Sequence, residues 1–184
     1  SYYGVSYAYA LSANNADGSR QVYFDLECGG WGGHPDGDGA NGFSCGFHNI
    51  SNTPVEMIEN DYPLTFLQYG LLPNSGGKGK YRGGLGLVRE FRLDAPEGTF
   101  SANLDRFKIP PYGLAGGKPG RTGQLMLRRF GTELEQNLES KVAGLTMKTG
   151  DIIRLETAGG GGHGNPQERS KTAIIADQLQ RYTR

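Results

Sequence analysis

The sequence has few cysteines, no excess of charge and no long apolar run, and each absence excludes a class of protein. Two cysteines in 184 residues are too few for a disulfide framework. With 19 basic and 19 acidic residues, the chain lacks the charge of a typical nucleic-acid binder or of a polybasic membrane contact. No apolar run approaches the roughly 20 residues that cross a bilayer, and the N-terminal residues lack the basic region of a secretory signal. We therefore expect a cytoplasmic protein without nucleic-acid or membrane partners.

Glycine is abundant instead, with 31 residues, about twice its usual share. It does not recur at every third position, which excludes collagen. Hydrophobic runs interrupted by glycine predict short strands joined by tight turns. We expect a mainly β (α+β) fold, with antiparallel Gly-rich sheets in a sandwich- or barrel-like single domain over residues 1–184.

Aromatic and β-branched segments predict about eight to ten strands. Residues 2–10 and 21–27 are expected to form a hairpin, because turn residues lie between them. In residues 85–93, the alternation places Arg89 on the same face as three apolar side chains. The further predicted strands are residues 64–72, 99–105, 123–130, 133–138, 141–147 and 151–158.

Two helices are expected. Thr53-Pro54-Val55-Glu56 has the form of a capping box, and Pro63 prevents continuation, so we predict a helix from about Pro54 to Asn60. The tail, residues 167–184, has a helical pattern. Its apolar residues on one stripe are Ile175, Leu179 and Tyr182.

The glycine-rich segment CGGWGGHPDGDGANG, residues 28–42, is the most conspicuous part of the chain. As a calcium loop starting at Asp36 it fails, because the fifth, sixth and twelfth positions are Ala40, Asn41 and Phe47. As a phosphate loop it also fails, since no Walker pattern precedes a helix here or in the later glycine runs. The remaining interpretation is backbone that packs closely against another segment or chain.

Zinc binding stays open as a minor alternative. Cysteine and histidine side chains are its usual ligands, but their spacing here matches no common zinc pattern. Free cysteines are also often small buried hydrophobes. The four zinc candidates are Cys28, His34, Cys45 and His48.

Other polar residues lie in loops, where function is often found. His34, His48 and His163 each have such a position, although a structural histidine is at least as common. Arg82 and Arg106 are of a type that binds carboxylate or phosphate with two parallel hydrogen bonds, or that forms ordinary ion pairs. No GxSxG nucleophile motif occurs. The residues alone therefore specify no reaction.

Several motifs in order resemble the hydantoinase B family, which includes parts of 5-oxoprolinase and of acetone and acetophenone carboxylases. They cover nearly the whole chain from about residue 20. The segments are CGGWGGHP with DGANG, then NTPVE, then PNSGGKGKYRGGLGLVREFR, then DRFKIPPYGLAGGKPG, and finally TAGGGGHGNP. NTPVE and SGGKGKYRGGLG are the most specific of these motifs.

The resemblance implies that the chain corresponds to the C-terminal third of a hydantoinase B-type subunit. It implies an enzyme complex with an N-terminal B-type chain and an A-type subunit that binds ATP with magnesium. Any divalent metal of the complex would have its ligands outside this chain. The implied reaction is ATP-dependent hydrolysis of a small cyclic amide, with ketone carboxylation as the alternative.

The resemblance also suggests which loop residues face the active site. These substrate-site candidates are His34, Asp36, His48, Asn52, Glu56 and Arg82. We expect the glycine loop to set His34 and Asp36 beside the NTPVE segment. The rival from another class is a stand-alone β module that binds sugar or metal through residues 28–42.

Overall fold

The computed structural model describes residues 1–4, 7–46 and 50–183. Nine strands and two α-helices lie in these residues, which confirms the mainly β architecture. None of the helices in these ranges is long and apolar enough to span a membrane. The strands are β1 (Tyr7–Asn14), β2 (Arg20–Glu27), β3 (Leu64–Leu71), β4 (Leu87–Leu93), β5 (Glu97–Asn103), β6 (Gln124–Arg128), β7 (Glu135–Asn137), β8 (Lys141–Lys148) and β9 (Ile152–Glu156). The helices are α1 (Val55–Asp61), α2 (Lys171–Leu179) and the short 3₁₀ helix η1 (Pro166–Glu168).

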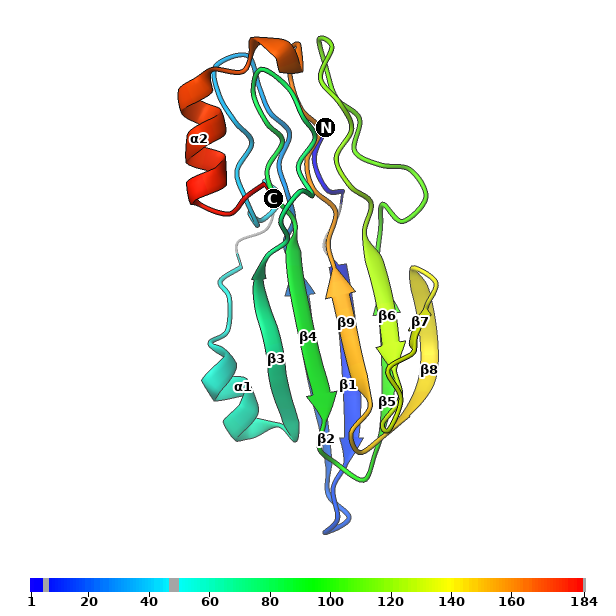
Figure 1. Cartoon of the computed structure of the whole chain (residues 1–184). Coiled ribbons are helices and arrows are strands. Elements are labelled where there is room, and N and C mark those ends of the chain that lie inside the picture. Colours follow the sequence, from blue (N-terminus) through cyan, green and yellow to red (C-terminus); the bar gives the residue numbers. More distant parts are fainter. Residues whose placement is uncertain (5–6, 47–49, 184) are drawn as a thin grey trace.

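Two antiparallel sheets form a sandwich (Figure 1). Their strand orders are β2-β1-β5-β8 and β3-β4-β9-β6-β7, and β1 and β2 form the expected hairpin. The core lies between the sheets, where Tyr9 of β1 stacks on Phe91 of β4 with ring centroids 5.8 Å apart. Inward-facing side chains alternate along β1 and β4, because successive residues of a strand point to opposite faces.

Glycine-rich segments run side by side above the sandwich in Figure 1. Residues 159–162 lie at their centre, and consecutive amides there donate to different neighbouring segments. This pattern suits an extended chain with three residues per turn, whose hydrogen-bonding groups point outward in three directions. The four bonds join Gly159 to Arg121, Gly160 to Gly84, Gly161 to Ser1 and Gly162 to Lys118.

These segments approach each other too closely for side chains. A Cβ atom on Gly160 would lie 1.8 Å from the carbonyl oxygen of Trp31, and one on Gly30 would lie 2.0 Å from that of Gly84. The loop of residues 28–42 therefore packs against other segments of this same chain. The N-terminus joins the bundle too, since Tyr3 N donates to Gly30 O at 3.0 Å, and residues 2–4, which were predicted to belong to the first strand, are not in a strand.

The helix α1 confirms the predicted short helix, but the predicted capping box is wrong. The helix begins at Val55 with Pro54 as its N-cap, and no side chain caps it. The start lies one position later than the box requires, so Thr53 is outside the cap position. Proline has no side-chain acceptor to replace the missing cap.

The C-terminal helix α2 turns its apolar stripe outward. Ile175 is 55% exposed and Leu179 is 80% exposed, whereas Asp177 is buried against the glycine-rich segments. Ser170 caps the helix by accepting a hydrogen bond from Ala173 N. The buried carboxylate of Asp177 therefore anchors the helix, and the helix presents aliphatic side chains at the surface.

Candidate active site

Arg89 of β4 lies between the two sheets and organises a buried polar cluster. Its side chain is only 1% exposed. Its Nε lies 2.7 Å from Glu27 Oε1, an ion-pair contact, and its Nη1 contacts Asp25 Oδ2 at 2.5 Å. Nη1 also donates to the hydroxyls of Tyr9 at 2.9 Å and Tyr23 at 3.0 Å. A buried cation is thus matched by two carboxylates and two phenols, as burial of charge requires.

The carboxyl of Glu27 has a pKa above its ordinary value. Burial raises the pKa of Glu27 to about 7, and the attraction of Arg89 offsets only part of that effect. Tyr9 donates a hydrogen bond to Glu27 Oε1 at 3.0 Å, and burial raises the pKa of Tyr9, so the phenol stays protonated. A carboxyl that titrates near neutrality is suited to move protons in catalysis, although structural ion pairs also shift pKa values.

Glu27 of this cluster lines a pocket of about 410 Å³. A volume of that size lies within the usual range for small-molecule sites, roughly 300–1,000 Å³. The pocket combines apolar walls with a few polar groups. Its polar side chains come from β2, β3 and the segments on either side of residues 47–49, and they are Glu27, Cys28, Ser44, Ser51, Asn52 and Tyr69.

Asn52 is held in one orientation at this pocket. Its Oδ1 accepts from Tyr69 OH at 2.7 Å and from Arg89 Nη2 at 3.0 Å. The Arg89 guanidinium lies over the Tyr69 ring at 4.2 Å, which fixes both partners. The arginine offers only donors, so the oxygen of the amide must face it, and the NH₂ group faces away.

Asn52 is the sequence-predicted candidate that the structure places in this pocket. Glu56 is exposed in the first turn of α1, which follows Asn52 closely in the chain. His48 lies outside the described residues. His34 and Asp36 lie elsewhere, at the exposed tip of a tight hairpin closed by reciprocal bonds between His34 and Gly37.

The glycine loop and the NTPVE segment are therefore not neighbours. Figure 1 shows the light-blue segment around residue 40 beside α2 in the upper half, and α1 in the lower half. The expected position of His34 and Asp36 beside the NTPVE segment is wrong. The physical reason is that the loop's glycines pack upward, against residues 81–84 and 158–161, and carry the hairpin with them.

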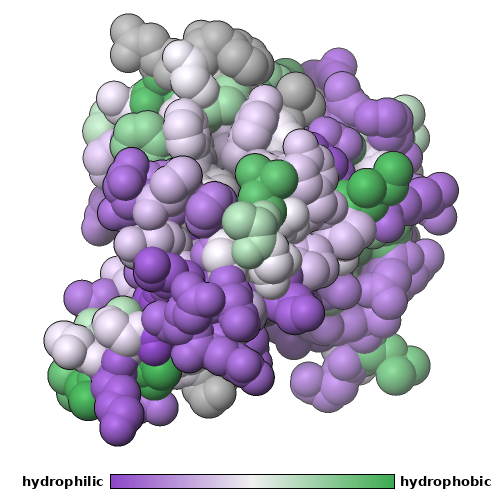
Figure 2. All heavy atoms as spheres, turned by 90° about the horizontal axis from the view of Figure 1, so that it is seen from above, coloured by the Kyte–Doolittle hydropathy of each residue, from purple (hydrophilic) through white to green (hydrophobic). Residues whose placement is uncertain are grey.

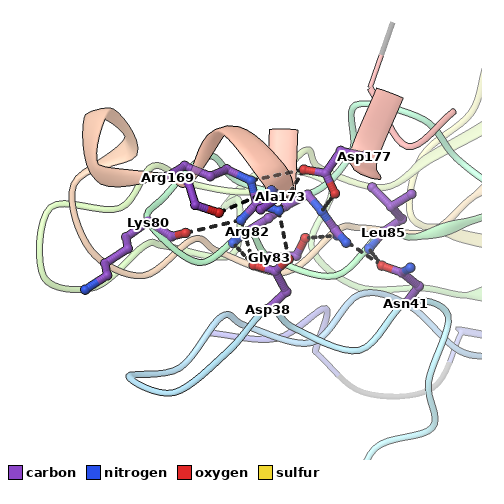
Figure 3. A network of polar contacts seen from close by, with 10 residues as sticks. Asp38, Asn41, Lys80, Arg82, Gly83, Leu85, Arg169, Ala173 and Asp177 are labelled. Atoms are coloured by element: carbon purple, nitrogen blue, oxygen red, sulfur yellow. Dashed lines mark hydrogen bonds and ion pairs between the residues drawn. The ribbon is translucent and has the colours of Figure 1, made fainter. Parts of the chain in front are cut away.

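Arg82 belongs to a second polar network, which joins α2 to the glycine-rich segments (Figure 3). Its Nε pairs with Asp177 at 3.2 Å, and its Nη1 donates to Asn41 Oδ1 at 3.0 Å. Arg169 contacts both Asp177, at 2.7 Å, and Asp38, also at 2.7 Å. Burial opposes ionisation of Asp38, but hydrogen bonds from Arg169 and the Arg82 amide lower its pKa below the ordinary value.

The end of the molecule that carries the glycine-rich segments, seen from above in Figure 2, shows no continuous apolar surface. Hydrophilic and near-neutral surface covers most of it, and hydrophobic residues form separate patches. The Arg82 side chain is buried in the network, with its guanidinium 5.1 Å from the centre of the Tyr182 ring. Its observed contacts thus hold α2 in place.

The zinc candidates show no complete ligand set in the described part of the chain. Cys28 and Cys45 are free thiols, and Cys45 is buried. Burial raises the pKa of the Cys28 thiol, which disfavours the thiolate that binds metals. No group of three or more His, Cys, Asp or Glu side chains that could hold a metal occurs among residues 1–4, 7–46 and 50–183.

The sequence carries a signal for Arg89 that a search for polar loop residues misses. A charged residue on the apolar face of a strand must find buried partners, and Arg89 shares its face with Phe91 and Leu93. In β2, Asp25 and Glu27 likewise share the face of Tyr23, whose side chain is buried. Both strands therefore carry opposite charges toward the same interior.

Comparison with known proteins agrees with these motifs. The hydantoinase B/oxoprolinase family model matches residues 2–166. A Pseudomonas sp. (strain NS671) protein described as the candidate B component of a D-/L-hydantoinase is 36% identical over 161 residues, which cover 88% of this chain and 27% of that protein. 5-Oxoprolinase 1 of Arabidopsis thaliana is 33% identical over 144 residues, covering 78% of this chain and 11% of the relative. The chain thus spans little more than a quarter of these relatives at most.

The fold has a solved counterpart. The ATP-dependent caprolactamase of Pseudomonas jessenii superposes with a TM-score of 0.84 at 19% identity, over 100% of this chain and 33% of that one. At such low identity the likeness shows a shared fold only. The family model and the sequence relatives carry the assignment, and both extend over most of the chain. The chain belongs to the hydantoinase B/oxoprolinase family.

Proposed function

We propose that this chain is the C-terminal part of a hydantoinase B-type subunit and forms one wall of the active site of an ATP-dependent cyclic amide hydrolase. The pocket lined by Glu27 and Asn52, both of which contact the buried Arg89, carries this proposal. It combines a carboxyl that titrates near neutrality with an oriented amide, in a cavity of small-molecule size. In this role Glu27 exchanges a proton with the amide nitrogen as the ring opens.

The remaining parts of the enzyme come from other segments and chains. This chain spans 27% of the hydantoinase B relative, so a longer subunit supplies the rest of the wall. We assign ATP and magnesium to an A-type partner, because the glycine runs here do not have the spacing of a phosphate-binding Walker loop. Any divalent metal of the complex has its ligands outside this chain. We place the assembled enzyme in the cytoplasm.

Exposed apolar side chains support an assembly. Phe24 and Val22, on the outer face of β2, are 59% and 55% exposed, and Leu179 of α2 is 80% exposed. Large exposed apolar residues that gather on one element are typical of contact surfaces. Both elements therefore offer surfaces for further parts of the subunit or for the A-type partner.

Ketone carboxylation is the second candidate. An acetone carboxylase superposes on the chain with a TM-score of 0.79 at 19% identity, which supports a shared fold. The sequence relatives described as hydantoinase and 5-oxoprolinase favour hydrolysis. The two reactions differ in an easily measured requirement, because carboxylation consumes bicarbonate and hydrolysis does not.

The test uses the complete B-type subunit that contains this chain, co-expressed with an A-type subunit. We expect ATP-dependent ring opening of hydantoin, 5-oxoproline or caprolactam, measured by product formation and ADP release. Glu27→Gln should lower turnover at least 100-fold at pH 7, and alanine at Glu56 or His48 should lower it without dissolving the complex. Glu133→Gln, on an exposed loop, is the matched control.

Two results would decide against the proposal. Bicarbonate-dependent consumption of acetone without ring opening would assign the carboxylase reaction instead. Full turnover in Glu27→Gln, with an intact complex by size-exclusion chromatography, would remove the pocket from the active site.

A further inference from the structure

Two side chains that line the pocket each have a polar atom that hydrogen-bonds to none of the described residues. Glu27 Oε1 takes the contacts from Arg89 Nε and Tyr9 OH, and no described residue bonds to Oε2. Asn52 Oδ1 takes the contacts from Arg89 and Tyr69, and none of the described residues bonds to Nδ2. Both side chains line the pocket, and Glu27 is almost wholly buried, since only 2% of it is exposed.

One guanidinium group sets the spacing of this pair. Nε of Arg89 makes an ion-pair contact with Glu27 Oε1 at 2.7 Å, and Nη2 of the same planar group donates to Asn52 Oδ1 at 3.0 Å. Because the guanidinium is planar and rigid, the carboxylate and the amide that contact it lie around one group. Glu27 and Asn52 both line the pocket, and their remaining polar atoms are an acceptor, Glu27 Oε2, and a donor, Asn52 Nδ2.

We infer that Glu27 and Asn52 recognise the N–H and C=O edge of a cis amide, so that the pocket selects cyclic amides over ketones and over open-chain secondary amides. Asn52 Nδ2 donates to the carbonyl oxygen of the ligand, and Glu27 Oε2 accepts from its N–H. This inference rests on the proposed function, since it names the substrate group that the same pocket binds.

The chemistry of the amide explains the selection. An open-chain secondary amide is planar and almost always trans, so its N–H and C=O point in opposite directions. A small ring forces the cis form and brings both groups to one edge, where they match an adjacent acceptor and donor. A ketone has no N–H and would leave the buried Glu27 oxygen without a partner. Sites built around such a hydrogen bond reject analogues that lack it.

Asn52→Asp is the sharpest test, because it changes only the outward group. The aspartate keeps an oxygen for Arg89 and Tyr69 but replaces the NH₂ donor by an acceptor that repels the carbonyl of the ligand. In the complete complex with ATP, we expect kcat/KM for a simple lactam, 2-pyrrolidinone or caprolactam, to fall at least tenfold, mainly through KM. The midpoint of urea unfolding should stay unchanged or rise.

The second measurement uses ligands instead of variants. The wild-type complex should favour the parent lactam over its N-methyl derivative at least tenfold, since the methyl group removes the proton that Glu27 accepts. Glu133→Gln serves as the control and should match the wild type in both measurements.

The outcomes distinguish a failure of the amide-recognition pair from a failure of the proposed function. If the wild type opens lactams but treats the N-methyl derivative and the parent alike, and Asn52→Asp retains full kcat/KM, the amide-recognition pair is overturned while the proposed function stands. If the wild-type complex opens no cyclic amide at all, the proposed function itself fails.

Discussion

Replacing Glu27 by glutamine should change how stability depends on pH. The replacement keeps the size of the side chain and removes its titration. Burial raises the pKa of Glu27 from the ordinary value of 4.5 to about 7. The folded chain therefore binds this proton more tightly than the unfolded chain does. Below pH 4.5 the stabilising effect of the proton is fully present, and it is lost as the pH rises through 7.

The expected size follows from that difference in pKa. A rise from 4.5 to about 7, at about 1.4 kcal/mol for each tenfold change in proton affinity, corresponds to about 3 kcal/mol. Wild-type stability should thus fall by up to about 3 kcal/mol, relative to Glu27→Gln, between about pH 5 and pH 8. Asp38 and Asp151 have lowered pKa values, so their own effects on stability lie below this range.

Urea unfolding at several pH values, followed through the fluorescence of Trp31, the only tryptophan, would measure this difference. Subtracting the curve of the variant removes the contributions of all other groups, and Glu133→Gln controls for loss of an exposed carboxylate. A difference that stays flat from about pH 5 to pH 8 would show that folding does not raise the pKa of Glu27. A wild type that gains stability with rising pH would show that the attraction of Arg89 outweighs the burial of Glu27.

Two further predictions concern the glycine-rich segments and α2. Gly160→Ala should lower the free energy of unfolding by more than about 4 kcal/mol or prevent folding, because its Cβ would lie 1.8 Å from Trp31 O. Its control is Gly70→Ala, where a Cβ would meet no atom within 4 Å. This control should change the free energy of unfolding by less than about 1 kcal/mol in the same urea assay. Asp177→Asn should lower the free energy of unfolding by about 3 kcal/mol and speed amide hydrogen exchange across α2, because Arg82 loses its buried carboxylate partner. Exchange in the exposed control Gln178→Ala should match the wild type. Exchange in Asp177→Asn that stays as slow as in the wild type would contradict the role of Asp177 in anchoring α2.

Local patterns in the sequence determined much of the fold. Alternating aromatic and β-branched residues marked the strands, and Pro54 and Pro63 bounded the short helix, because these signals act over a few residues. The motifs also indicated the family, through segments such as NTPVE and SGGKGKYRGGLG, and the family model that matches residues 2–166 confirms it. The excess of glycine pointed to close packing of backbone, and residues 28–42 do pack in that way.

Only the tertiary structure decided where the chemistry lies. Arg89 meets Glu27 of a strand in the other sheet, and Arg82 meets Asp177 across 95 positions of sequence, so both pairs depend on how sheets and loops pack. Periodicity can say that a charge points inward, but it cannot name the partner that compensates it. The glycine loop shows the same limit: its residues suggested a site beside the NTPVE segment, whereas the packing of its backbone carried His34 and Asp36 to the far end.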